Sequence, residues 1–319
     1  MKKEKKERKM KEPVVLTEEE IRKNKKRRVI GLSVGIPVCA LGLAAGIAVG
    51  VLIAPAWFDK EIDYGNIASD SLEDDPEALM KRYKSASRGS YDTTFKPYEI
   101  VNIGLEKIKA ETNVYSQQIG VVHAMGVEQT IRATSIKNDG KYFLENISKS
   151  DMVPTARRFY QEGDEVKTYK GSNVEKTKAD WNDLSSTLTL QEHEDKWGKD
   201  LSRPSIYVVS SKTALETSKT EKVSGGYKVS IDLDPVKGVV RYVKQMVNIS
   251  DVKNPKFHSV HIEYNLDEDL KLMSLHIKES YSVVMVVKAE SEGEINETFH
   301  YEAKEIPELT TNVDYPEGA

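Results

Sequence analysis

The chain has 319 residues, and 31% of them are charged, which excludes a protein built mainly of membrane-spanning helices. Its content of 39% hydrophobic and 8% aromatic residues excludes wholesale disorder. A single cysteine excludes an internal disulfide and a zinc site made of several cysteines. The length is compatible with one large β domain plus appendages.

Charge is distributed very unevenly along the chain. Residues 1–28 carry 13 Lys/Arg and 6 Glu, a net charge of +7, whereas the remainder carries 34 Lys/Arg and 45 Asp/Glu, a net charge of −11. Between the two parts, residues 29–53 contain no charged side chain. Twenty-five residues of helix at about 1.5 Å each are long enough to cross a hydrocarbon core of about 30 Å. This pattern predicts a transmembrane helix within residues 29–56.

The basic cluster of residues 22–28 predicts the orientation of this helix, because positive residues beside a first span stay in the cytoplasm. We therefore expect a cytoplasmic tail (1–28), an acidic stalk (57–75) and an extracellular domain (76–305) followed by a C-terminal tail (306–319). Cleavage after Ala56 is the alternative, since residues 54–56 resemble a signal-peptidase site. Gly42, Gly46 and Gly50 follow the spacing that allows two membrane helices to associate, and plain anchoring is the simpler interpretation.

The outer part predicts an α+β domain. Apolar residues at helical spacing predict helices over 76–87, 97–110 and 235–247. Short alternating runs separated by turn residues predict a meander over 114–171 and a second set of strands. That second set comprises SIYVVSS, YKVSIDL, HSVHIEYNL, LKLMSLHIKE, YSVVMVVKAES and NETFHYEA. All of these strands are expected to form one large antiparallel sheet, which the helices cover.

A polar segment, residues 172–204, interrupts the strand pattern and carries Trp181 and Trp197. It is too long for an ordinary connection between strands. Two interpretations remain open. The segment is either a lid anchored by the two indoles or a connector whose tryptophans close one end of the sheet.

The sequence contains no catalytic or metal-binding motif that exceeds chance. The six histidines lack the spacing of a zinc protease. His258 and His261 are three residues apart, so on a regular strand they point to opposite faces, which argues against a shared metal. We therefore expect a protein without cofactor, metal or enzymatic activity, and no nucleic-acid partner for the basic tail.

The stretches SIYVVSS, GGYKVSIDLDP, YVKQM, NPKFHSVHIEYNLDEDLKL and KESYSVVMVVKAE resemble membrane-anchored Gram-positive members of the LolA/LppX-like group of bacterial envelope proteins. The resemblance covers most of residues 76–305. It implies a strongly curved half-barrel with helices on its concave face, and a hydrophobic cavity that holds lipid or another envelope ligand. On that basis Ile100, Leu105, Val239 and Val243 are the expected cavity residues. A scaffold with a filled core and a protein partner is the alternative.

Overall fold

The computed structural model describes residues 62–124, 126–150, 154–197, 201–249, 253–284 and 288–313. All of these residues belong to one compact unit. The predicted cytoplasmic tail, transmembrane helix and glycine spacing lie outside the described residues. Within those residues, no helix combines the length and the apolar character needed to cross a membrane.

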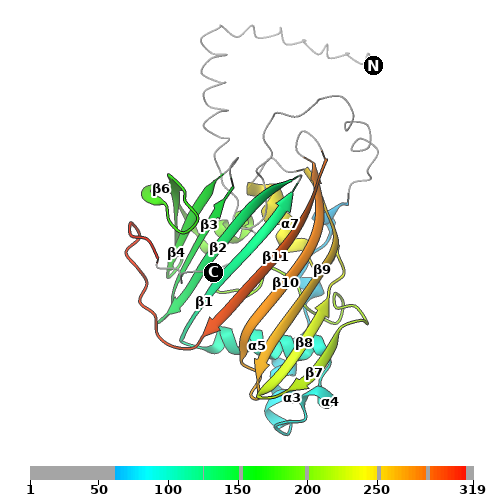
Figure 1. Ribbon diagram of the computed structural model, residues 1–319. Coiled ribbons are helices and arrows are strands. Elements are labelled where there is room, and N and C mark those ends of the chain that lie inside the picture. Colours follow the sequence, from blue (N-terminus) through cyan, green and yellow to red (C-terminus); the bar gives the residue numbers. More distant parts are fainter. Residues whose placement is uncertain are drawn as a thin grey trace, which may run out of the picture. The chain divides into compact units, whose positions relative to one another are not determined.

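Eleven antiparallel strands form one sheet with the order β6-β5-β4-β3-β2-β1-β11-β10-β9-β8-β7 (Figure 1). This confirms the prediction of one large sheet and the meander that opens it, since β1 to β5 follow one another as neighbours. The strands are β1 (Asn113–Ala124), β2 (Val127–Asn138), β3 (Lys141–Lys149), β4 (Thr155–Glu162), β5 (Glu165–Ser172), β6 (Asp180–Thr189), β7 (Lys219–Val223), β8 (Gly226–Asp232), β9 (Lys253–Asp267), β10 (Leu272–Val284) and β11 (Lys288–His300).

The sheet is not strongly curled, which corrects the expected strongly curved half-barrel. Strong curvature needs bulges or kinks repeated along the strands. Here the central ladders joining β3, β2, β1, β11 and β10 keep an unbroken register, and irregularities occur in the β9–β10 and β5–β6 ladders. The edge strands β6 and β7 each pair on one side, so the sheet stays open.

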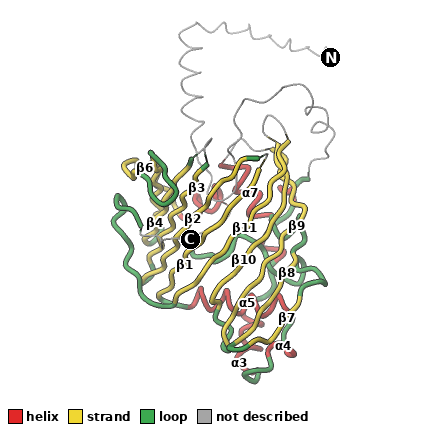
Figure 2. The backbone as a smooth tube through the Cα atoms, in the orientation of Figure 1, coloured by secondary structure: helices red, strands yellow, loops and turns green. Residues whose placement is uncertain are grey.

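The helices gather on one face of the sheet, here called the inner face (Figure 2). The described helices are η1 (Tyr64–Asn66), η2 (Ser69–Leu72), α3 (Pro76–Ser85), α4 (Tyr91–Thr94), α5 (Pro97–Ala110), α6 (Leu190–Trp197) and α7 (Val240–Ile249). Helix α5 has the predicted bounds. Pro97 opens it, and the Glu99 carboxylate accepts the backbone N–H of Lys96 at 2.8 Å.

Helix α7 begins at Val240, five residues later than predicted. The Asp234 carboxylate accepts the backbone N–H groups of Val236 and Lys237, both at 2.9 Å, and so caps a separate turn. The carbonyl of Gly238, which ends this turn, accepts the N–H of Val208 at 2.9 Å. The loop that contains Val208 therefore occupies the Gly238 carbonyl, which a helix beginning at Pro235 would have used for its own backbone hydrogen bonds.

The predicted strand SIYVVSS is instead an irregular loop. Both sides of this run are buried. Tyr207 and Val209 pack into the main core, and Val208 packs on the other side with Leu72 and Val240. Burial on both sides gives a strand-like apolar run, but the backbone turns here, and the Thr213 hydroxyl donates to the Val208 carbonyl at 2.7 Å.

The polar segment between β5 and β7 also differs from a plain connection, because it contains the edge strand β6 and the helix α6.

After β11, residues 301–313 turn back across the opposite face of the sheet, the outer face (Figure 1). Val313 packs there against Ile136 and Phe143. The side-chain oxygen of Asn312 accepts the indole N–H of Trp181 at 3.0 Å.

Candidate functional site

A cavity of about 170 Å³ lies between the inner face of the sheet and the loop of residues 201–207. Its position follows from how the helices are distributed. Helices α5 and α7 pack against β8, β9 and β10, and α6 packs against β5 and β6. The inner face of β11, β1, β2 and β3 lies between these helices without a helix packed on it, and the loop of residues 201–207 covers it. This loop is called the cavity loop below.

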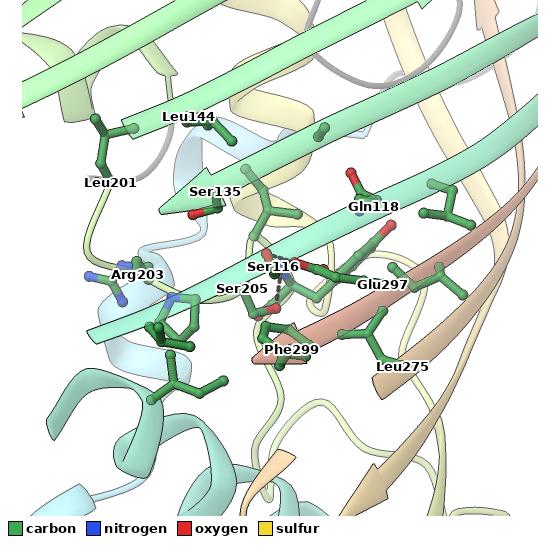
Figure 3. Close-up of a pocket in the computed structure, with 18 of the residues that line it drawn as sticks. Ser116, Gln118, Ser135, Leu144, Leu201, Arg203, Ser205, Leu275, Glu297 and Phe299 are labelled. Carbon is green, nitrogen blue, oxygen red and sulfur yellow. Dashed lines mark hydrogen bonds between the residues drawn. The ribbon is translucent and has the colours of Figure 1, made fainter. Parts of the chain in front are cut away.

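The floor of the cavity is polar, although it belongs to the covered face of the sheet. The Ser116 hydroxyl donates to the Glu297 carboxylate at 2.6 Å, and Figure 3 shows the two side chains meeting in the middle of the pocket. Gln118, Ser135 and Asn146 also line the floor. Ser116 and Asn146 are almost completely buried. A buried hydroxyl is costly without a hydrogen-bond partner, and Ser116 has one in Glu297.

The walls of the cavity are apolar and aromatic. The aliphatic wall residues include Leu144, Leu201, Pro204, Ile206, Leu275 and Ile277, and the aromatic ones include Tyr207, Tyr242, Tyr264 and Phe299. Burial, reinforced by the charge of Glu297, raises the pKa of the Tyr264 phenol far above its ordinary value. The cavity therefore combines apolar and aromatic walls with a polar floor, and three charged residues line it: Lys137, Arg203 and Glu297.

A second carboxylate lies behind two of the tyrosines. Glu279 is 4% exposed and accepts the phenol groups of Tyr207 at 2.5 Å and Tyr242 at 3.3 Å. These bonds hold the two aromatic rings, which pack edge to face with centroids 5.7 Å apart. Glu279 thus orients the wall and is not itself a lining residue.

The cavity loop is fixed by the segment that precedes α3. Arg203 and Arg241 both bind the Glu73 carboxylate, at 2.8 and 2.6 Å. Leu72 is buried against Val208. Residues 62–75, which belong to the acidic stalk of the sequence analysis, are therefore folded onto the domain.

The four expected cavity residues lie in the solid core. Ile100, Leu105, Val239 and Val243 are all buried in the main apolar cluster beneath α5 and α7. Leu105 also lines a smaller pocket of about 80 Å³ on the other side of the cavity loop. None of the four lines the larger cavity. Their role in ligand binding stays a prediction.

The two expected lid tryptophans are both anchored. Trp181 on β6 lies 4.0 Å from the Arg158 guanidinium and is held by Asn312 on the outer face. Trp197 ends α6 and packs edge to face on Phe159, with ring centroids 4.6 Å apart. Each indole is at most 2% exposed, so both close the β4–β6 end of the sheet.

The positions of His258 and His261 correct the expectation that their side chains point to opposite faces of the sheet. A register shift opposite Ser280 and Tyr281 displaces His258, so His258 and His261 both point to the outer face. They bind different carboxylates, Glu290 at 3.0 Å and Asp232 at 2.6 Å. Within the described residues, no group of three His, Cys, Asp or Glu side chains could hold a metal ion.

Ser116 and Glu297 were not predicted as site residues, because neither belongs to an apolar stripe of a predicted helix. A signal was present, because alternate inner-face positions of β1 read Val114, Ser116, Gln118 and Gly120. The corresponding positions of β8 to β10 are almost entirely apolar or aromatic. Small and polar residues on a covered face indicate that something other than a helix packs there.

The architecture is that of an α+β protein in which helices cover one face of a large, open antiparallel sheet. No protein-family model and no curated relative matches the chain. Among solved structures, it is similar to a DUF1329 family protein from Desulfovibrio piger, with 12% identity, 65% of this chain and 92% of that chain covered, and a TM-score of 0.26. It is also similar to the YwiB protein from Bacillus subtilis, with 12% identity, coverage of 59% and 91%, and a TM-score of 0.18. Neither similarity carries an argument about function.

Proposed function

We propose that this protein is a non-enzymatic binding module, tethered to the cell membrane, which takes up a hydrophobic envelope ligand outside the cell. The observation that carries the proposal is the cavity under the cavity loop, with its aliphatic and aromatic walls. An apolar group placed there leaves water, and burial of apolar surface contributes roughly 25 cal/mol per Å².

The size of the cavity limits what it can hold. A dry apolar cavity of about 150 Å³ accommodates benzene, whereas pockets for drug-sized ligands measure roughly 300–1,000 Å³. At about 170 Å³, this cavity matches one ring or the end of one aliphatic chain. We therefore propose that a larger lipid would insert only one end, with the remainder outside the cavity loop.

The tether is proposed from the charge pattern. The uncharged residues 29–53 behind the basic residues 22–28 are typical of a single anchor with its N-terminus in the cytoplasm. The binding domain would then face the extracellular side, close to the bilayer that supplies its ligand. Gly42, Gly46 and Gly50 offer a small-residue face for association with a second membrane helix.

The proposed relation to the LolA/LppX-like group concerns the plan of the domain. A sheet covered on one face by helices, with a cavity between sheet and covering segments, supports that relation. The proposal does not require a strongly curved sheet. It requires that the inner face of β1 to β3 binds a ligand in place of a fourth packed helix.

Native mass spectrometry of the chain released from its host membrane tests the proposal. We expect a bound ligand of defined mass. Ser135→Leu, which places a larger side chain in the cavity, should remove that ligand, whereas Ser259→Leu on the exposed outer face should retain it. Wild-type protein without bound ligand, from a membrane that contains its natural lipids, would contradict the proposal.

The alternative is a structural or protein-interaction component of the cell envelope with a filled core. One observation favours it, because α5 and α7 pack against β8 to β10, and the four expected cavity residues are all buried in the apolar core there. In that case both serine variants would purify in the same ligand-free state, and a partner protein would be recovered by cross-linking.

A further inference from the structure

We propose that the ligand carries a carboxamide or hydroxyl group, which is held at the cavity floor between the side-chain amides of Gln118 and Asn146. This inference rests on the proposed binding function and names the polar part of the ligand. Its starting point is the position of these two amides, which line the same cavity from two different strands.

The strand register places the two amides on one line across the sheet. Gln118 on β1 is paired with Ala133 on β2, and Ala133 is paired with Asn146 on β3. All three residues line the cavity, so they share the inner face. Neighbouring strands lie about 4.8 Å apart, so roughly 10 Å separates the two amide-bearing residues. The short side chain of Ala133 leaves a space above β2 with an amide on each side.

These two amides are available for hydrogen bonding. The Ser116 hydroxyl, one row away on β1, already donates to the Glu297 carboxylate at 2.6 Å. Within the part of the chain that the structure describes, the side chains of Gln118 and Asn146 make no hydrogen bond to the protein. A side-chain amide has two donor hydrogens and an acceptor oxygen, so each of the two can bind a ligand group from its own side.

The burial of the amides makes their hydrogen bonding selective. Asn146 is 5% exposed and Gln118 is half-buried, so neither amide is open to bulk solvent. A ligand that displaces water from buried polar groups loses affinity unless it replaces the hydrogen bonds of that water. A site built around such groups therefore rejects an analogue that cannot pair with them. A wholly apolar group above Ala133 would leave both amides unpaired and is disfavoured.

The chemistry of an amide defines the complementary group. Because each amide both donates and accepts, the group between them should also do both. A carboxamide or a hydroxyl meets this requirement, whereas a ketone only accepts and a chloroalkane offers no donor. The same complementarity allows Asn and Gln side chains to pair with the donor and acceptor edge of adenine.

The apolar part of the ligand would occupy the other side of the cavity. Leu144 and Leu201 lie across the pocket from Gln118 in Figure 3, and both line the cavity. A short aliphatic chain can therefore extend from the amides towards these leucines and the cavity loop. The ligand class that fits this arrangement is an aliphatic amide or alcohol, bound with its polar end at the floor.

Two six-carbon probes, hexanamide and 1-chlorohexane, test this inference on the wild type and on Gln118→Leu. The full chain is placed in nanodiscs of an uncharged galactolipid, and each probe is titrated by calorimetry against empty nanodiscs, which corrects for uptake into the lipid. Gln118→Leu removes the hydrogen bonds on one side of the site and should weaken hexanamide binding about tenfold. It should not weaken the binding of 1-chlorohexane, which makes no such bonds.

The neighbouring glutamine provides the matched control. Gln117 adjoins Gln118 on β1 and projects from the opposite face, so Gln117→Leu should leave both affinities unchanged. Asn146→Leu removes the second amide and should act like Gln118→Leu. Should neither variant at the site fold, nuclear magnetic resonance of the wild type decides, because hexanamide but not 1-chlorohexane should shift the side-chain amide signals of Gln118 and Asn146.

The remaining outcomes separate this inference from the binding function. Hexanamide binding that is unchanged in both Gln118→Leu and Asn146→Leu would overturn the inference and support the binding function. An equal loss of both probes would show that the substitutions obstruct the cavity, and would also overturn the inference alone. No binding of either probe to the wild type would overturn both.

Discussion

The ion pair between Glu145 and Arg158 allows a quantitative test of how the outer face is held together. The Arg158 Nε–H donates to the Glu145 carboxylate at 2.6 Å, and both side chains are completely buried. The guanidinium also donates to the Leu309 carbonyl at 2.9 Å and lies over the Trp181 ring. The pair therefore joins β3 and β4 to the C-terminal segment that crosses them.

Replacing Glu145 with Gln removes the charge and leaves the shape of the side chain. Arg158 then stays charged in a fully buried site, since an arginine does not lose its proton in a protein. Removing one partner of a buried pair costs about 3–5 kcal/mol, and the free energy of unfolding should fall by that amount. Replacing both partners, as in Glu145→Gln with Arg158→Met, should cost less than Glu145→Gln alone because no unpaired charge remains.

Urea unfolding, followed by tryptophan fluorescence, measures these changes. Glu162→Gln is the matched control, because Glu162 binds Lys141 at 2.8 Å in an exposed pair on the same part of the sheet. Exposed pairs contribute little, so the control should unfold like the wild type. A Glu145→Gln variant that is as stable as the control would show that the buried pair does not hold the outer face together.

Three further predictions concern packing, pH and the cavity loop. Gly104→Ala should destabilise α5 by up to about 2 kcal/mol in thermal unfolding, because an added Cβ would lie 2.9 Å from Leu266 and overpacking outweighs the helix propensity of alanine. Burial, followed by the nearby Asp234 carboxylate, raises the pKa of Tyr64 to about 12. The unfolded chain then loses this proton first, so stability should fall as the pH rises from about 10 to 12, and Tyr64→Phe should lessen the fall. Glu73→Gln should increase hydrogen exchange in residues 201–207, since it weakens the contacts that hold Arg203.

Much of the fold could be predicted because most strands have one buried side. In β8 and β9, alternate residues are apolar and buried. The predicted bounds of β8 differ from the observed ones by one residue at each end, whereas β9 begins at Lys253, five residues before the predicted start. Helix α5 was predicted residue for residue, since Pro97 marks its start and its apolar residues recur at helical spacing. Local pattern and tertiary burial agree at these places.

The differences arise where burial does not follow from local pattern. The loop at Tyr207 to Val209 is buried on both sides by segments distant in sequence, so its apolar run wrongly predicts a strand. The bulge that turns His258 outward depends on the neighbouring strand. The cavity itself depends on where α5, α6 and α7 do not pack, which no single segment of the sequence reveals.

The cavity under residues 201–207 is proposed to bind the apolar end of a ligand. The test is to add hexanol and to measure intermolecular nuclear Overhauser effects between its hexyl chain and the methyl groups of the protein. We predict contacts to the methyl groups of Leu144 and Leu201, which line the cavity, and none to those of Val239 and Val243 in the filled core. Contacts to Val239 and Val243 alone, or no contacts to any of the four, would contradict the claim.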